Sequence, residues 1–222
     1  MASETYREAD RAGGGMVVAD PAPLGLGAFA LTTFMLSAHN AGWAPDVVWI
    51  GVAIFYGGIA QLLAGMWEFR NRNVFGATAF STYGGFWLSL GSFVILATLT
   101  KLGTGLNVDR SLGWFLIAFA IFNSYMLLWS ARVNKAVFLV FLTLEATEVL
   151  LFWGFLGTSS DLIKAGGYMG VITALVAWYA SAAGVVNGMS SHTILPVGAP
   201  MWTDEPRSDR PHRFGRHHEA AT

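Results

Sequence analysis

An uncharged stretch of the chain, residues 73–100, most restricts how it can fold. No Asp, Glu, Lys or Arg occurs in it, and at about 1.5 Å per residue a helix of this length crosses a hydrocarbon layer of roughly 30 Å. The stretch also carries small and hydroxyl residues, among them Gly76, Thr78, Ser81, Tyr83 and Gly84. A membrane helix with so many polar side chains should turn them towards another helix or towards a polar solute.

The composition of the whole chain supports this interpretation. Hydrophobic residues make up 54% of the 222 residues, charged residues only 12%, and the mean hydropathy is +0.50. Too little polar surface remains for a soluble domain of this length. There is no cysteine, which excludes a disulfide framework and a thiol nucleophile. We therefore predict an all-α, polytopic membrane protein.

Apolar segments follow one another at short intervals after Asp20, and they predict six transmembrane helices. The expected spans are residues 24–44, 47–67, 77–99, 112–130, 137–156 and 166–187. The loops between them are too short for a soluble domain. We expect a disordered N-terminal tail at 1–20, a six-helix membrane domain at 21–198 and a disordered, charged tail at 199–222. The first tail has no apolar run typical of a cleavable signal peptide.

The positions of lysine and arginine predict the orientation. Ten of the 13 lie in the two tails and in the second and fourth loops: Arg7, Arg11, Arg70, Arg72, Arg132, Lys135, Arg207, Arg210, Arg213 and Arg216. Positively charged loops stay inside, so both termini should be cytoplasmic, as an even number of spans requires. We expect a multi-pass protein of the plasma or inner membrane.

The fifth predicted span carries two acidic residues, Glu145 and Glu148. They are three residues apart and so share a face of the helix. A charge at this depth costs about 2.5–3.5 kcal/mol on insertion scales, so both should face the protein interior or a wet cavity. Two neighbouring acids there should not both ionise, and at least one is expected to hold a proton at neutral pH. Either residue could instead form a structural hydrogen bond between helices, the interpretation we favour for Glu145.

Other polar residues also fall at membrane depth. Gln61 in the second span could bond across a helix pair or line a pathway. Asn123 lies in the fourth span. In the sixth, Gly166, Gly170 and Ala174 form a ridge of small residues that favours close helix contact.

Motifs for catalysis or nucleotide binding are absent from the sequence. It has no H-E-x-x-H, no G-x-S-x-G and no P-loop. We expect no catalytic residues, no cofactor, no metal and no nucleic-acid partner. Uphill transport would then have to use an ion gradient.

Three stretches resemble the acetate uptake transporter family of the succinate-acetate permease type. They are PAPLGL at 21–26, the run from FYGGIAQ at 55–61 through FGATAFSTYGGFW at 75–87, and TILPVG at 193–198. The similarity extends over about residues 20–198. It implies six helices per protomer, a pathway through each protomer, a homohexameric ring, and uptake of acetate and related short carboxylates with protons.

The resemblance also implies a narrow hydrophobic constriction made by Phe29, Tyr83 and Leu142. Three features depart from the family pattern. Asp20 replaces the usual asparagine before the first motif, Arg72, Asn73 and Val74 replace Gly-Asn-Thr, and the pair in the fifth span is not a family requirement.

Our hypothesis is a proton-assisted transporter for acetate and related short carboxylates. The constriction would strip water from the solute, Gln61, Thr78, Ser81 and Asn123 would replace the lost hydrogen bonds, and Glu148, followed by Glu145, would hold the proton. Two alternatives remain: a passive channel for acetate or acetic acid, and a membrane acid sensor or scaffold, which the short loops disfavour.

Overall fold

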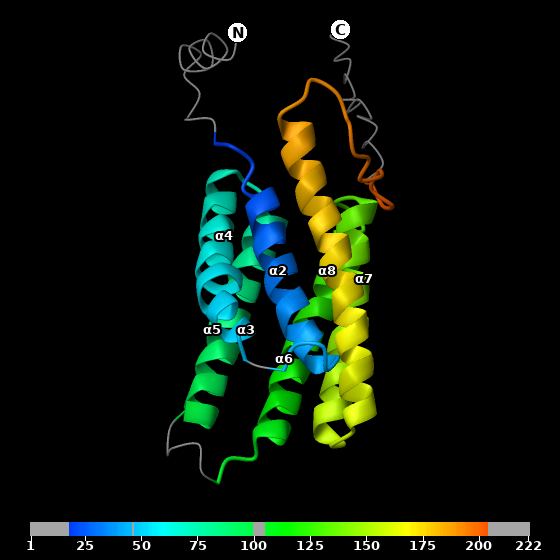
Figure 1. Ribbon diagram of the computed structural model, residues 1–222. Coiled ribbons are helices and arrows are strands. Elements are labelled where there is room, and N and C mark those ends of the chain that lie inside the picture. The colour runs from blue at the N-terminus through cyan, green and yellow to red at the C-terminus, as the bar shows by residue number, and fades with distance from the viewer. Residues whose placement is uncertain (1–17, 46, 100–104, 204–222) are drawn as a thin grey trace, which may run out of the picture.

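The computed structural model describes residues 18–45, 47–99 and 105–203, which form a bundle of long helices (Figure 1). Six helical segments within these residues are long and apolar enough to cross a membrane, so the predicted number of spans is confirmed. They are α2 (Ala22–Asn40), the composite α3 (Trp49–Val52), η1 (Ala53–Ala60) and α4 (Gln61–Arg70), then α5 (Val74–Leu99), α6 (Val108–Ser130), α7 (Lys135–Leu156) and α8 (Ser160–Gly188). The expected tails at 1–17 and 204–222 lie outside the described residues.

Side-chain caps make three helices begin earlier than their hydrophobic segments predict. Asn107 accepts a hydrogen bond from the backbone N–H of Arg110 (3.0 Å), and Asn134 accepts one from Val137 (2.9 Å). Ser159 caps α8 in the same way. These caps satisfy the free N–H groups of the first turn, so the helices extend into polar residues beyond the apolar core.

The second span contains a π-helix. Residues of η1, which include Gly57 and Gly58, lie between the α-helical segments α3 and α4. A Cβ on Gly57 would lie 2.6 Å from the Thr32 hydroxyl oxygen of α2, so this glycine permits the close approach of two helices. π-helical turns within α-helices are frequent at functional sites, and this one is followed directly by Gln61, the first residue of α4.

Glycine also brings α8 against α2. A Cβ on Gly167 would lie 2.5 Å from the backbone nitrogen of Ala41 and 2.8 Å from the carbonyl oxygen of Ser37. Gly170 faces Ser37 and Thr147, so α8 packs between α2 and α7. The structural interpretation of the glycine ridge is therefore confirmed.

A C-terminal strap, residues 189–203, folds back over the turn between α6 and α7. The Asn187 side chain accepts hydrogen bonds from the backbone N–H groups of Ile194 and Leu195, and the carbonyl of Val197 accepts one from Ala136 N–H at the start of α7 (3.0 Å). Trp202 stacks on Trp129, with ring centroids 5.4 Å apart. The strap thus continues past residue 198, where we placed the end of the membrane domain.

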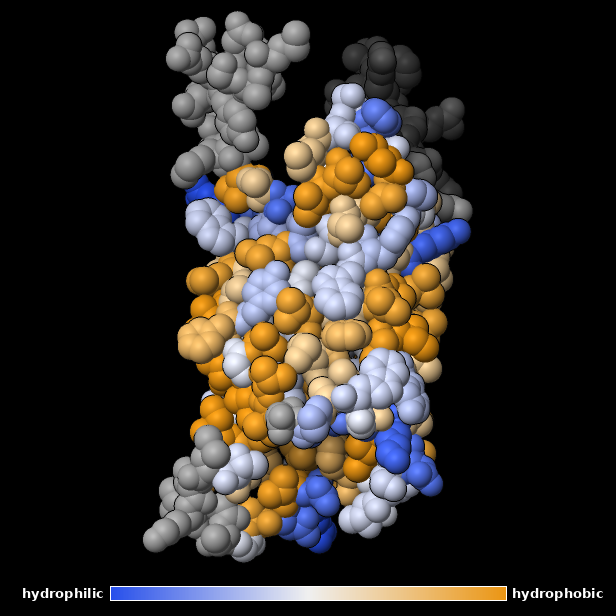
Figure 2. All heavy atoms as spheres, in the orientation of Figure 1, coloured by the Kyte–Doolittle hydropathy of each residue, from blue (hydrophilic) through white to orange (hydrophobic). Residues whose placement is uncertain are grey.

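The described ends of the chain lie near the same end of the bundle (Figure 1), which the charge pattern predicts to be cytoplasmic. On the face shown in Figure 2, hydrophobic side chains cover most of the middle and the most hydrophilic ones gather towards the two ends. This is the distribution expected of a surface that faces lipid.

Candidate functional site

Within the described part of the chain, two cavities are relevant to a solute pathway. The larger has a volume of about 380 Å³ and is walled by residues of α2, α3, α5, α6, α7 and α8, towards the end opposite the strap. The smaller, of about 70 Å³, lies towards the strap, between the starts of α2, α5 and α7 and next to Gln61. Together they form an interrupted path along the bundle.

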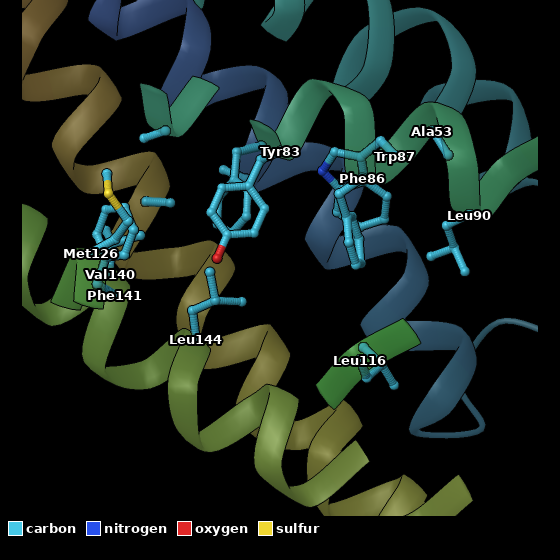
Figure 3. Packing of buried hydrophobic residues seen from close by; sticks show 14 of the residues in the cluster. Ala53, Tyr83, Phe86, Trp87, Leu90, Leu116, Met126, Val140, Phe141 and Leu144 are labelled. Atoms are coloured by element: carbon cyan, nitrogen blue, oxygen red, sulfur yellow. The ribbon is translucent and has the colours of Figure 1, made fainter. Parts of the chain in front are cut away.

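Of the described residues, three line both cavities: Phe29, Tyr83 and Leu144. We call these three residues the junction. The rings of Phe29 and Tyr83 meet edge to face, with centroids 5.5 Å apart, and Figure 3 shows the Tyr83 side chain reaching from α5 towards Leu144 of α7. Their apolar surfaces separate the two spaces.

The structure does not support the prediction of Leu142 as the third member of the constriction. Leu142 is 43% exposed on the outside of α7, whereas Leu144 is 6% exposed. Successive residues of an α-helix are about 100° apart, so an alignment error of two positions moves the side chain to the opposite face. We correct the set to Phe29, Tyr83 and Leu144.

Of the eight buried side-chain polar atoms that make no hydrogen bond among the described residues, five belong to residues that line the large cavity. They are Thr33 Oγ1, Trp49 Nε1, Trp87 Nε1 and both carboxyl oxygens of Glu148. Buried polar groups are normally satisfied, so these groups are available to bind water or a polar solute. Thr33, Trp49 and Trp87 were not predicted as site residues from the sequence.

The two glutamates have different surroundings. Glu148 is 2% exposed and belongs to the wall of the large cavity. Glu145 is only partly buried; one of its oxygens accepts a hydrogen bond from Asn123 Nδ2 (2.6 Å), and the other lies 2.9 Å from the Ser124 hydroxyl. The favoured structural interpretation therefore fits Glu145, while Glu148 has the position expected of a proton carrier.

Asn123 lies behind the junction instead of lining a cavity. It is fully buried, and its Oδ1 accepts a hydrogen bond from the Tyr83 hydroxyl (2.9 Å). Its Nδ2 also donates to the backbone carbonyl of Phe141 (3.0 Å). Asn123 thus contacts the junction through Tyr83, and the prediction that it binds the solute directly is not supported.

The remaining predicted binding residues separate into two groups. Gln61 is fully buried, lines the small cavity, and its carbonyl oxygen has no hydrogen-bond partner among the described residues. Thr78 and Ser81 line neither of the two cavities. Ser81 instead packs against Gly65 of α4, so this part of the hydroxyl row on α5 serves a helix contact.

Glu68 was not predicted as a site residue from the sequence. The structure buries it completely near the end of α4, and Asn71 Nδ2 donates a hydrogen bond to its Oε2 (3.0 Å). Its neighbour Asn73 lines the small cavity. Within the described residues no cluster of three His, Asp or Glu side chains could hold a metal ion.

Comparison with known proteins identifies the family. Residues 15–201 match the sequence profile of the GPR1/FUN34/yaaH family. The chain belongs to this family. One family relative, acetate permease A of Emericella nidulans, is 42% identical over 209 residues, which cover 86% of this chain and 70% of that protein.

Bacterial members of the GPR1/FUN34/yaaH family match over nearly their full length. The succinate-acetate/proton symporter SatP of Escherichia coli K12 is 36% identical over 83% of this chain and 98% of its own. A solved structure described as the bacterial acetate channel SatP superposes with a TM-score of 0.78 at 36% identity, over 82% of this chain and all of that one. By contrast, the chain spans 64% of accumulation of dyads protein 2 from Saccharomyces cerevisiae, which is 42% identical.

Proposed function

We propose that the protein moves acetate and related short carboxylates across the membrane together with protons. The observation that carries this proposal is the junction of Phe29, Tyr83 and Leu144 between two cavities, with the buried Glu148 carboxyl in the wall of the larger one. The names of the relatives, an acetate permease and a succinate-acetate/proton symporter, support it.

Electrostatics explains why a proton should accompany the solute. Moving one negative charge inward against about 100 mV, inside negative, opposes uptake by roughly 2.3 kcal/mol, a factor of about fifty. A proton that travels with the carboxylate removes this cost. The apolar junction also favours the protonated solute, because it offers few hydrogen bonds to replace the water that a carboxylate loses.

The cavity walls supply hydrogen bonds on each side of the junction. In the large cavity, the indole N–H groups of Trp49 and Trp87 and the hydroxyl of Thr33 can donate to a carboxylate. Glu148 can deliver a proton there before the solute crosses. In the small cavity, the carbonyl of Gln61 can accept a hydrogen bond from the undissociated acid.

Uptake of labelled acetate into proteoliposomes tests the proposal. A pH gradient and a potassium diffusion potential are imposed separately, and protein-free vesicles correct for acetic acid that leaks through lipid. With one proton per carboxylate, accumulation follows the pH gradient, about tenfold for each pH unit, and ignores the voltage. Absence of protein-dependent uptake in both arms contradicts transport of acetate.

A passive acetate channel is the second candidate, and the description of the solved relative as an acetate channel favours it. A channel for the anion would respond to voltage: an inside-positive potential of about 100 mV would raise the equilibrium acetate ratio by a factor of about fifty. Accumulation under the potential alone would therefore replace the proton-coupled mechanism with this one.

We also propose that the protein forms the homohexamer implied by the family resemblance. Native mass spectrometry of the detergent-solubilised protein tests it through the mass of the complex. A monomer retained across gentle detergents and protein concentrations contradicts the ring.

A further inference from the structure

The hydroxyl of the junction residue Tyr83 is joined to a polar cluster behind it. Tyr83 on α5 donates to Asn123 Oδ1 on α6 (2.9 Å), and Asn123 Nδ2 donates to Glu145 Oε2 on α7 (2.6 Å). The Ser124 hydroxyl lies 2.9 Å from the second Glu145 oxygen. Three helices thus contribute to one chain of hydrogen bonds that ends at the pathway.

Backbone geometry fixes the orientation of the Asn123 amide. Its Nδ2 lies 3.0 Å from the carbonyl oxygen of Phe141, a group that can only accept. The carboxylate of Glu145 accepts the second amide hydrogen. Since Phe141 and Glu145 accept both amide hydrogens, Asn123 Oδ1 must face the Tyr83 hydroxyl. The opposite amide orientation would place Asn123 Oδ1 against two acceptors, the carbonyl oxygen of Phe141 and the carboxylate of Glu145.

The single hydroxyl hydrogen of Tyr83 is therefore committed to Asn123. A phenol has one hydrogen to donate, so only the lone pairs of its oxygen remain for the cavities. An undissociated carboxylic acid can donate a hydrogen bond to this oxygen. A carboxylate cannot, because it has only lone pairs to offer, and the other two junction residues are apolar.

We propose that Asn123, held by Phe141 and Glu145, makes the Tyr83 hydroxyl an acceptor only, so that the junction passes the undissociated acid and discriminates against the carboxylate anion. This inference rests on the proposed function and assigns Asn123 and Glu145 as positioning residues. The other titratable groups around Tyr83 are Glu148 on α7, whose carboxyl interacts with the Tyr83 hydroxyl, and Tyr125 on α6. A protonated Glu148 can donate to this hydroxyl and does not compete for its hydrogen.

A double-mutant cycle on the full-length protein tests the role of Asn123. Asn123→Leu removes the acceptor and frees the Tyr83 hydrogen to point into the pathway and bind a carboxylate. A hydrogen bond to a charged group changes an equilibrium by about tenfold or more. We therefore expect the ratio of acetate-dependent current to labelled acetate flux to rise at least about tenfold in reconstituted membranes.

The Tyr83 hydroxyl provides the control for this variant. In Asn123→Leu/Tyr83→Phe no hydrogen is left to donate, so the rise in the ratio should disappear. A rise that persists in the double variant would mean a structural leak and would overturn the proposal. Met126→Leu, a buried residue one turn along α6, should leave the ratio unchanged. Labelled acetate flux in the unmodified protein separates failure of the proposed function from failure of this inference. Absence of flux refutes the proposed function. Normal flux with an unchanged ratio of current to flux in Asn123→Leu refutes only this inference.

An infrared difference spectrum covers the case in which Asn123→Leu does not assemble. Subtracting the spectrum of Tyr83→Phe from that of the unmodified protein isolates the C–O stretching band of Tyr83, whose frequency depends on whether the phenol donates or accepts. A band typical of a donating phenol is expected without acetate. A band of an accepting or free phenol would overturn the proposal in the native protein.

Discussion

Shortening Leu144 should relax selection by solute size. Leu144 is 6% exposed and lies between cavities of about 380 and 70 Å³, so Leu144→Ala removes three carbon atoms from the barrier. One methylene that fits or fails to fit a close-packed site is worth about 1–3 kcal/mol, or about 10- to 200-fold. The ratio of butyrate to acetate uptake should therefore rise at least about tenfold.

Leu142→Ala is the matched control. It deletes the same atoms two residues away on α7, at a position that is 43% exposed and outside both cavities, so the uptake ratio should not change. Initial rates of labelled butyrate and acetate uptake are measured in proteoliposomes with equal protein content, after subtraction of protein-free vesicles.

Stability must be measured alongside, because Leu→Ala at a buried site costs about 2–5 kcal/mol. Thermal unfolding in detergent and size-exclusion chromatography show whether Leu144→Ala is folded. A folded variant with an unchanged ratio, or an equal rise in both variants, would refute the assignment of Leu144 to the junction.

Three further predictions concern the proton, the helix packing and the strap. Glu148→Gln keeps the side-chain size but cannot hold a transferable proton, so pH-driven acetate uptake should fall at least about tenfold while the oligomer stays assembled. Unchanged uptake with the same pH profile would exclude Glu148 as the proton carrier. Gly167→Ala should lower the midpoint of thermal unfolding because its Cβ would meet the backbone of α2, whereas Gly85→Ala, with no neighbour within 4 Å, should leave it unchanged or raise it. Trp202→Ala loses the stacking on Trp129, which is worth about 0.5–1.5 kcal/mol beyond the buried area. The variant should therefore be cleaved faster by protease within the strap. An unchanged cleavage rate would mean that other contacts hold the strap.

Hydropathy was sufficient to predict the six spans, because a membrane requires about twenty apolar residues per helix wherever that helix lies in the bundle. The ends were predicted less well. We expected the last span to begin at Gly166, but α8 begins at Ser160. Ser159 caps a first turn that contains Asp161, and hydrogen bonding continues a helix through polar residues that hydropathy excludes.

The site depends on which way each helix faces, and the sequence contains little information about this rotation. Thr78 and Ser81 belong to a polar row that suggested a pathway, yet Ser81 packs on Gly65 of α4. Asn123 was recognised as polar at membrane depth, but its partners Phe141 and Glu145 come from another helix. Only the three-dimensional packing reveals that such a residue lies behind the pathway.

The strap also sets an order in which the protein can be completed during synthesis. The N–H of Ala136, in the first turn of α7, is satisfied by the carbonyl of Val197, a residue that the ribosome adds about sixty positions later, after all of α8. After α7 is inserted, the Ala136 N–H therefore lacks its Val197 partner while translation continues at about 5–20 residues per second. During these seconds water or another protein can bind the exposed turn, and the strap closes it when Val197 leaves the ribosome.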